Sequence, residues 1–241
     1  MSIWEYANPV KFMRLSGAVL PWLVAGAAIG TIGGVAWGFL TPEDYKQGST
    51  VKIVFLHVPA AMMAINIWVM MLVASLIWLI RRHHVSALAA KAAGPIGMVM
   101  TLIALATGAI WGQPMWGTAW EWDPRLTSFL ILLLFYFGYI ALWSAVEDAD
   151  SAADLTGVLC LVGSVFALLS RYAVLFWNQG LHQGASLSVA PGERMSAVYR
   201  YPLYLSMIGF LLLFLALMLI RTRTEIRKRR LAALQAKEAR A

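Results

Sequence analysis

The stretch that decides the fold is residues 53–80, which read IVFLHVPAAMMAINIWVMMLVASLIWLI. It contains no Asp, Glu, Lys or Arg, and it is longer than the roughly 20 residues that a helix needs to cross a bilayer. Of the 241 residues in the chain, 61% are hydrophobic and only 13% are charged, and the mean hydropathy is +0.71. Such values are far from those of soluble domains, so residues 53–80 are predicted to form a transmembrane helix.

Five other segments have the same apolar character, once small residues are counted as compatible with a membrane. The sequence therefore predicts an all-α, polytopic membrane protein with six transmembrane helices in a single integral membrane domain, residues 1–241. The first segment lacks a small-residue cleavage site after it, so we interpret it as a retained helix rather than a signal peptide. We place the helices at about 17–40, 53–80, 92–110, 126–146, 153–177 and 197–220.

The basic residues sort by side of the membrane, which argues against a nucleic-acid partner despite the net charge of +7. They gather before the first helix (Lys11, Arg14), between the second and third (Arg81, Arg82, Lys91), and in eight positions from Arg221 onward. Because positive charge in short loops marks the cytoplasmic side, we expect both termini to be cytoplasmic. Residues 221–241 are predicted to form a basic cytoplasmic tail, a helix lying on anionic lipid.

One loop fits this topology poorly, because acidic side chains crowd between the fourth and fifth helices, on the predicted cytoplasmic side. Acidic residues contribute little to topology, so we keep the six-helix prediction. The acids are Glu147, Asp148, Asp150 and Asp154.

With both ends inside, the loops after the first, third and fifth helices are predicted to be external. His57 opens the second helix in FLHVPAAMM, residues 111–127 read WGQPMWGTAWEWDPRLT, and His182 follows the fifth helix in WNQGLHQGAS. Three separate segments therefore converge on one membrane face. His83 and His84 fall on the opposite face beside Arg81 and Arg82, where we interpret them as ordinary boundary residues.

The external loop at 111–127 is unusually rich in tryptophan. One or two tryptophans at a helix end would be an aromatic belt at headgroup depth. Four of them, separated by glycines and followed by acidic and basic side chains, instead resemble a platform for a flat apolar ligand, because indole rings offer stiff stacking surfaces. Arg125 could meet a ligand carboxylate with paired hydrogen bonds. The platform consists of Trp111, Trp116, Trp120 and Trp122, followed by Asp123.

The two external histidines are candidate axial ligands for haem iron, since neutral imidazole is a good iron ligand and iron in a porphyrin needs only two. A single histidine at a helix end is more often an interfacial hydrogen-bonding residue. Zinc fits less well, because it usually takes about three or four protein ligands. The chain has one cysteine, Cys160, and no C-x-x-C-H motif for covalent haem attachment.

The string WGQPMWGTAWEWDPRLTS resembles the tryptophan-rich WWD signature of haem-handling membrane proteins. FLHVPAA and WNQGLHQG resemble the histidine segments of the cytochrome c maturation protein C family (CcmC, haem exporter protein C), and the resemblance runs from Pro21 through the last helix. It implies a protein of the bacterial inner membrane, or of a mitochondrial equivalent, that holds haem b non-covalently at its periplasmic face. By position it implies His57 and His182 as the axial ligands and residues 111–123 as the cradle.

The resemblance also implies a function and partners. Haem is presented to the membrane-tethered haem chaperone CcmE, which binds it covalently during cytochrome c biogenesis, while the small subunit CcmD and the ABC transporter subunits CcmA and CcmB complete the assembly. The chain would then be a haem-transfer protein rather than an enzyme. Two positions depart from the family pattern: Ala119 stands where a tryptophan is expected, and Arg171 where a histidine is expected. Arg171 would meet a haem propionate or reach the lipid headgroups.

Two other classes of function remain open. A b-type electron-transfer protein would keep its haem, but such proteins usually place both histidines inside helices, whereas His182 lies in a loop. A transporter that moves a solute through its own bundle commonly shows ionisable residues near the membrane midplane. Here the charged side chains within the predicted helices are Asp154, Arg171 and Arg200, and all three are near helix ends.

The predicted topology can be tested with reporter fusions. Reporters after Tyr45, Gly117 and Gln183 should report the outside, because each follows an odd-numbered predicted helix, and reporters after His84 and Ala149 should report the inside. Activity of a periplasmic reporter and fluorescence of a cytoplasmic one are the measurements. An outside result at Ala149 would mean that the fourth and fifth helices are wrongly drawn.

Overall fold

The computed structural model describes residues 8–176 and 195–239, and within these ranges it is helical with no strand. Six of its helices are long and apolar enough to cross a membrane, which confirms the predicted all-α class and the six membrane-spanning helices. A short 3-10 helix, η2, precedes the second of them. The elements are α1 (Pro9–Phe39), η2 (Ser49–Ile53), α2 (Val54–Arg81), α3 (His84–Trp116), α4 (Pro124–Ala145), α5 (Ala149–Phe176) and α6 (Ala197–Glu238).

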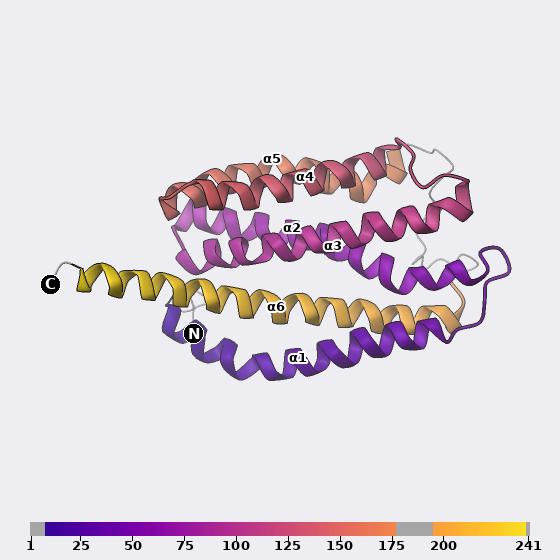
Figure 1. The fold of residues 1–241 in the computed structure, drawn as a ribbon, viewed down its shortest axis with the longest axis horizontal. Coiled ribbons are helices and arrows are strands. Elements are labelled where there is room, and N and C mark those ends of the chain that lie inside the picture. The colour runs from indigo at the N-terminus through magenta and orange to yellow at the C-terminus, as the bar shows by residue number, and fades with distance from the viewer. Residues whose placement is uncertain (1–7, 177–194, 240–241) are drawn as a thin grey trace.

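The helices run along a common direction in three pairs (Figure 1). α1 packs mainly against α6 on one flank, α4 packs against α5 on the other, and α2 and α3 lie between them. α1 begins and α6 ends at the same end of the bundle, which we call the termini end. The opposite end, which carries residues 40–53 and 117–123, is called the loop end. The start of α1 and the end of α6 therefore lie at the same end of the bundle, as the predicted topology requires.

The centre of the bundle is built around two fully buried aromatic side chains, Trp68 on α2 and Tyr136 on α4. Their rings meet edge to face, with centroids 4.8 Å apart. The Tyr136 hydroxyl donates to the carbonyl of Ala64 at 2.7 Å, and Trp68 Nε1 donates to the carbonyl of Cys160 at 3.2 Å. These bonds satisfy both polar groups inside the protein and connect α2 with α4 and α5.

α1 and α6 approach each other so closely that only glycine fits at their contact. A Cβ atom on Gly209 would lie 2.2 Å from the backbone nitrogen of Thr31, and one on Gly34 would lie 2.4 Å from the backbone nitrogen of Ser206. Small residues of this kind let membrane helices pack backbone to backbone. The opposite face of α1 exposes large apolar side chains such as Trp22, which suits contact with lipid.

Several helices extend beyond the segments predicted from hydropathy. α1 begins at Pro9, where the Asn8 side chain accepts a hydrogen bond from the backbone of Val10. α3 covers His84–Trp116 instead of 92–110, because good helix formers precede the apolar stretch and Pro114 is accommodated in the last turns. It ends at Gly117, whose φ of 79° is left-handed and favours glycine. The predicted external loop 111–127 therefore contains the end of α3 and the start of α4.

The basic tail is helical, as predicted, but it continues α6 along its axis instead of turning away from it (Figure 1). Its first turn is fastened to the bundle. Arg221 Nε donates to the carbonyl of Ala92 at 2.9 Å, and Arg223 donates to Ser16 Oγ at 2.8 Å. Glu225 pairs with Lys91 of α3 at 2.8 Å. These contacts hold residues 221–225 of α6 against α1 and α3, beyond the apolar part of the helix.

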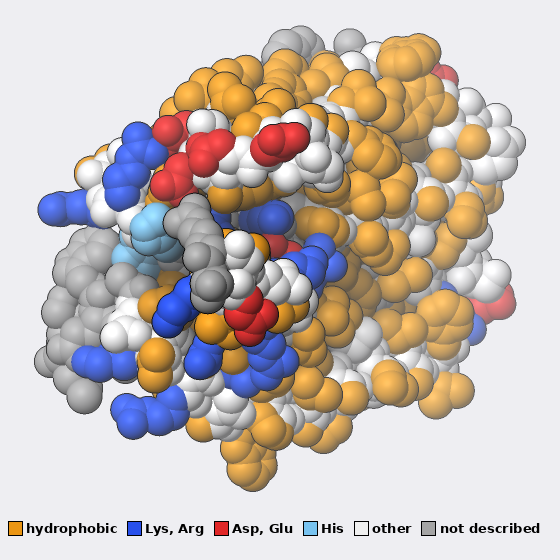
Figure 2. Space-filling model, turned by 60° about the vertical axis from the view of Figure 1, so that its left-hand side comes forward, with side chains coloured by type: hydrophobic (Ala, Val, Ile, Leu, Met, Phe, Trp, Pro, Cys, Tyr) orange, Lys and Arg blue, Asp and Glu red, His pale blue; other side chains and the backbone are white. Residues whose placement is uncertain are grey.

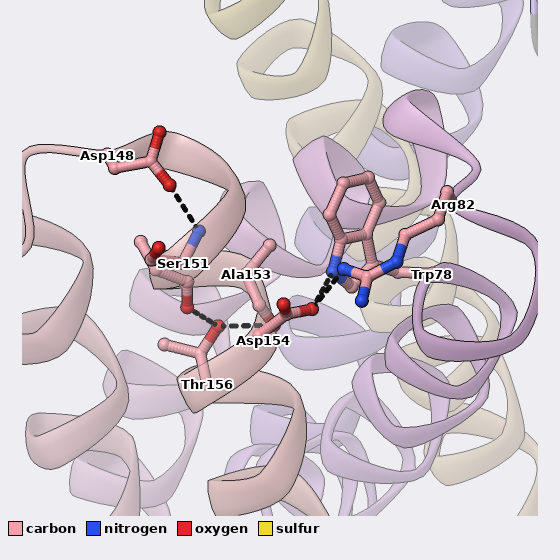
Figure 3. Close-up of polar contacts among 8 residues, drawn as sticks. Trp78, Arg82, Asp148, Ser151, Ala153, Asp154 and Thr156 are labelled. Atoms are coloured by element: carbon pink, nitrogen blue, oxygen red, sulfur yellow. Dashed lines mark hydrogen bonds and ion pairs between the residues drawn. The ribbon is translucent and has the colours of Figure 1, made fainter.

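Two of the four acids that fitted the predicted topology poorly, Asp148 and Asp154, have structural partners at the termini end (Figure 3). The Asp154 carboxylate accepts a hydrogen bond from Trp78 Nε1 at 2.9 Å and pairs with Arg82, so it connects α5 to α2. Asp148 caps α5, accepting from the backbone of Ser151 at 2.8 Å. Hydrogen bonds from the Ser151 side chain and backbone lower the pKa of Asp148, so this contribution to stability is lost only in acid.

Hydrophobic and charged side chains occupy different parts of the surface (Figure 2). Hydrophobic side chains cover the flank of the bundle in that view, and charged side chains gather at the termini end, which faces forward there. His83 and His84 belong to this end. His83 caps α3 by accepting from the backbone nitrogen of Ser86 at 3.1 Å, and the His84 ring lies 5.3 Å from the Trp78 ring. Both have structural contacts, in agreement with their interpretation as boundary residues.

Candidate functional site

His57 lies in the first turns of α2 at the loop end and contacts α3. Its Nδ1 atom is 3.0 Å from the hydroxyl oxygen of Thr107. The ring is half-buried, and a Cβ atom on Gly108 would lie 3.1 Å from its Cε1 atom. Gly108 therefore forms a hollow on α3 into which the imidazole fits, while Thr107 contacts one ring nitrogen. Both are residues that the sequence interpretation missed.

The first half of the tryptophan segment continues from this contact along α3. Trp111 lies one helical turn beyond Thr107 on the same face, and its Nε1 donates to Gln47 Oε1 at 3.0 Å. The Trp111 and Trp116 rings meet edge to face with centroids 5.2 Å apart, and Trp116 closes over Gly112. These two indoles therefore form one aromatic cluster with the His57 contact one turn below it.

The second half of the segment is a short loop between α3 and α4. It turns at Gly117, and the Thr118 hydroxyl donates to the carbonyl of Trp120 at 2.9 Å, which bends the chain back. The Trp120 and Trp122 rings pack edge to face with centroids 5.5 Å apart. Trp122 is 74% exposed, whereas Trp120 is half-buried. This second aromatic pair faces outward from the loop end through Trp122.

Trp120 carries a buried polar atom that has no acceptor among residues 8–176 and 195–239. Its Nε1 is one of four buried side-chain nitrogen or oxygen atoms without a hydrogen-bond partner there. Thr31 and Ser206 lie in the contact between α1 and α6, and Trp143 lies in α4 toward the termini end, so Trp120 is the member of this set in the tryptophan segment. Buried donors are nearly always paired, so this N–H is open to an acceptor that the described residues do not supply.

Asp123 has a clear local role. It is the N-cap residue of α4, and its Oδ1 accepts from the backbone nitrogen of Leu126 at 2.6 Å. Pro124 follows in the first turn of the helix, where the missing N–H of proline has no consequence. The buried Asp123 therefore holds the end of the tryptophan segment against α4. This is a structural explanation for a residue that the sequence assigned to the cradle.

Two cations lie close together where α4 begins and α5 ends. Arg125 interacts electrostatically with Asp123, which attracts it, and with Arg171, which repels it. Arg171 is exposed, and its guanidinium lies 5.9 Å from the Tyr172 ring. α4 and α5 are joined at this level by a hydrogen bond of 2.9 Å between the hydroxyls of Ser128 and Ser170. Two guanidinium groups near enough to repel each other favour an anionic ligand such as a carboxylate.

The structure thus brings the predicted site residues together in two groups at the loop end. His57, Trp111 and Trp116 form one group around α3, and Trp120, Trp122, Asp123, Arg125 and Arg171 form the other around the start of α4. His182 lies outside the described residues. No three His, Cys, Asp or Glu side chains within the described part of the chain are grouped so as to hold a metal ion. Donors from the protein alone therefore do not form a metal centre there.

These features define a class: a multi-pass helical membrane protein with an aromatic, histidine-bearing and cationic site at one end of its bundle. Comparison with known proteins identifies the family. The family model described as Heme exporter protein C (CcmC) matches residues 2–237, and the chain belongs to this family.

Curated relatives support the same assignment. The chain is 85% identical over 241 residues to the heme exporter protein C of Paracoccus denitrificans (strain Pd 1222), with 100% of both chains covered. It is 71% identical to the Rhodobacter capsulatus protein of that name, over 99% of both chains. The Escherichia coli (strain K12) relative is 43% identical over 93% of this chain and 91% of its own. The resemblance drawn from the sequence is confirmed.

The role of Asp123 as a helix cap can be tested with two substitutions. Asp123→Ala should lower the free energy of unfolding by about 0.5–2 kcal/mol, because the amide of Leu126 loses its acceptor. Asp123→Asn should cost much less, because asparagine caps helices about as well as aspartate. Thermal unfolding of the purified variants in detergent measures both. Equal losses would mean that the negative charge matters rather than the cap.

Proposed function

We propose that this chain binds haem at the loop end of its bundle and passes it to a haem chaperone, CcmE, during the biogenesis of c-type cytochromes. The haem is the cargo of the protein, held non-covalently as haem b, and no catalytic step is assigned to the chain. Membership of the heme exporter protein C family supports haem handling. The chemistry of the loop end supports the location of the site.

The observation that carries the proposal is the buried indole N–H of Trp120, for which the described residues supply no acceptor. It lies five residues before Arg125, a half-buried guanidinium that is attracted by Asp123 and, more weakly, repelled by Arg171. A ligand with carboxylates would relieve both conditions at once, because it offers acceptors to the N–H and negative charge to the cations. Haem has this chemistry, with a flat apolar ring for stacking and two propionates at one edge.

His57 supports the same location from the other side. Its contact residue Thr107 lies one helical turn before Trp111 on α3, and its ring packs against Gly108, which limits movement of the ring. A neutral imidazole in this position could serve as an axial ligand, with His182 supplying the second from the segment outside the described residues. The donor set of two imidazoles, indole faces and guanidinium groups therefore fits haem.

The position of the site suits transfer rather than storage. The tryptophan segment is the connection between two helices, and Trp122 at its surface is 74% exposed. A ligand held at the end of the bundle would remain accessible to a partner docking there, while a ligand between helices at mid-membrane would not. We therefore favour a releasable site over the permanent haem of a b-type electron-transfer protein.

The same proposal includes location and partners. The basic residues at the termini end favour a cytoplasmic position for that end, which puts the haem site at the periplasmic face of a bacterial inner membrane. The small membrane subunit CcmD and the ABC transporter subunits CcmA and CcmB would assemble with the chain, and membrane lipid would cover the exposed apolar flank seen in Figure 2. The external-loop prediction from the sequence agrees with this orientation.

Axial ligation can be tested by removing each histidine and supplying imidazole. His57→Gly and His182→Gly should each lose the low-spin absorption spectrum of the purified protein and the loading of CcmE, since one iron ligand is gone. Millimolar imidazole should restore part of both, because the free ring enters the cavity and supplies the missing nitrogen. The double variant should recover less.

His84→Gly is the matched control, because it removes a histidine from the termini end. It should keep the wild-type spectrum without imidazole. A normal spectrum for His182→Gly would contradict its assignment as a ligand, and a colourless wild-type protein from haem-replete cells would contradict the proposal as a whole.

The role of the Trp120 N–H can be separated from that of its ring by Trp120→Phe. Phenylalanine keeps an aromatic surface but removes the donor, so haem binding should weaken by about 1.5–3 kcal/mol if the acceptor is a charged propionate. In haem-free protein the same change should leave thermal stability equal or higher, because an unpaired buried donor is gone. Haem titration and thermal unfolding measure the two effects.

Trp122→Phe is the matched control, since Trp122 is exposed and its nitrogen can reach water. It should change haem affinity less than Trp120→Phe does. Equal affinities for wild type and Trp120→Phe would show that the haem does not accept from this nitrogen.

A further inference from the structure

We propose that the hydroxyl of Thr107 is the positioning group for His57: it accepts a hydrogen bond from Nδ1–H and so leaves the lone pair of the ring on Nε2, directed to the iron of the bound haem. This inference rests on the proposed function, because it concerns how one of the two axial ligands is prepared. It assigns a role to a residue outside the tryptophan and histidine motifs.

The proton count at Thr107 carries the argument. The hydroxyl oxygen lies 2.6 Å from the carbonyl oxygen of Ile103, one turn earlier on α3, and 3.3 Å from that of Ala104. Two oxygen atoms at 2.6 Å need a proton between them, and a hydroxyl has only one to donate. Its proton is therefore committed to the carbonyl of Ile103. Toward His57 the hydroxyl can only accept.

The tautomer of His57 follows from this commitment. Nδ1 lies 3.0 Å from the Thr107 oxygen, a hydrogen-bond distance, so Nδ1 carries the proton and donates. In a neutral imidazole the other nitrogen, Nε2, then holds the lone pair that binds a metal. Metal-ligating histidines almost always donate their second N–H in this way, which orients the ring and raises its basicity.

Gly108 also positions the His57 ring, because its lack of a side chain leaves room for the ring to pack against α3. The Cε1 atom, which lies between the two ring nitrogens, packs where a side chain on Gly108 would begin, at 3.1 Å. Thr107 and Gly108 are neighbours on α3, while His57 is on α2, so the ring is held at the contact between two helices. The hydrogen bond and the packing together limit rotation of the ring. Nε2 is thereby presented in one direction.

The acceptor for His57 Nδ1–H is the neutral hydroxyl of Thr107 instead of a carboxylate, and this difference affects the transfer of haem. A carboxylate acceptor would give the imidazole strong anionic character and hold ferric iron tightly, whereas a hydroxyl strengthens the ligand only moderately. A ligand that must release its cargo benefits from this moderate strength. Thr107 therefore sets how strongly the His57 imidazole binds iron as well as how the ring is oriented.

The test compares Thr107→Val, which keeps the branched shape but removes the acceptor, with Thr107→Ser, which keeps the hydroxyl. In the purified haem-bound protein, Thr107→Val should bind haem about 10- to 100-fold more weakly. Its haem midpoint potential should shift to a more positive value, because a weaker donor stabilises ferric iron less. Thr107→Ser should behave like the wild type in both measurements. Thr107→Ala replaces Thr107→Val if the valine variant does not accumulate.

Resonance Raman spectroscopy gives a readout that packing alone would not change. In the ferrous His182→Gly protein, where His57 is the remaining axial ligand, the iron–histidine stretching frequency should fall in Thr107→Val and be retained in Thr107→Ser. Wild-type frequency, potential and affinity in Thr107→Val would overturn the inference. Equal losses in the serine and valine variants would overturn it too, because the methyl group and not the hydroxyl would then matter.

The outcomes separate this inference from the proposed function. If His57→Gly keeps the low-spin spectrum, His57 is not a ligand and the proposed site itself fails. If His57→Gly loses the spectrum and Thr107→Val keeps the wild-type potential, only the inference about Thr107 fails. Gly108→Ala should reduce haem retention by displacing the ring, whereas Gly138→Ala, where a Cβ would lie 3.7 Å from Leu159, should not.

Discussion

The bundle depends on the burial of Trp68 and Tyr136 between α2, α4 and α5. In a hydrocarbon environment their N–H and O–H groups have no water to bind, so each must donate to a carbonyl on a neighbouring helix. Trp68 donates to Cys160 and Tyr136 to Ala64, and glycines make room for the rings, since a side chain on Gly97 would collide with Tyr136. This pair therefore sets the spacing of the helices, and the ends of these helices carry the site.

The two ends of the bundle use polar side chains differently. At the termini end, acids and bases satisfy one another: Asp154 binds Trp78 and Arg82, and Glu225 binds Lys91. At the loop end, Arg125 is repelled by Arg171, and the nitrogen of Trp120 has no acceptor within the described residues. Because a buried polar group without a partner lowers stability, the N–H of Trp120 is a candidate contact for a ligand at the loop end.

The tryptophan segment combines structural and ligand-binding residues. Trp111 donates a hydrogen bond to Gln47 where the segment begins, Gly117 ends α3 where the segment turns, and Asp123 caps α4 where the segment stops. Trp120 and Trp122 are placed by that framework. His57 on α2 contacts Thr107 on α3, one helical turn before Trp111. This contact links α2, which carries the proposed iron ligand, to the start of the tryptophan segment. The tryptophan segment is therefore a turn fixed by structural contacts, and it presents Trp120 and Trp122.

The sequence by itself determined the class, the number of spans and the family. Long apolar stretches require helices because a membrane-spanning backbone must bond internally, and the motif around residues 111–127 is specific enough to indicate the relatives. Hydropathy did not determine the helix ends, since α3 and α6 continue past the apolar segments under the control of capping and helix propensity. Asp123 was predicted as a cradle residue, and the structure adds that its carboxylate caps α4 through the Leu126 amide, a contact that the sequence interpretation did not foresee.

Only the tertiary structure decided which residues surround His57. Thr107 is 50 residues from His57 along the chain and Gly108 follows it directly, and neither belongs to a distinctive pattern, because a threonine and a glycine are ordinary in a membrane helix. Their relation to the histidine exists only when α2 and α3 pack side by side. The electrostatic repulsion between Arg125 and Arg171 likewise arises only when α4 and α5 pack together. Sequence patterns report each helix separately, whereas orientation of a ligand depends on contacts between helices.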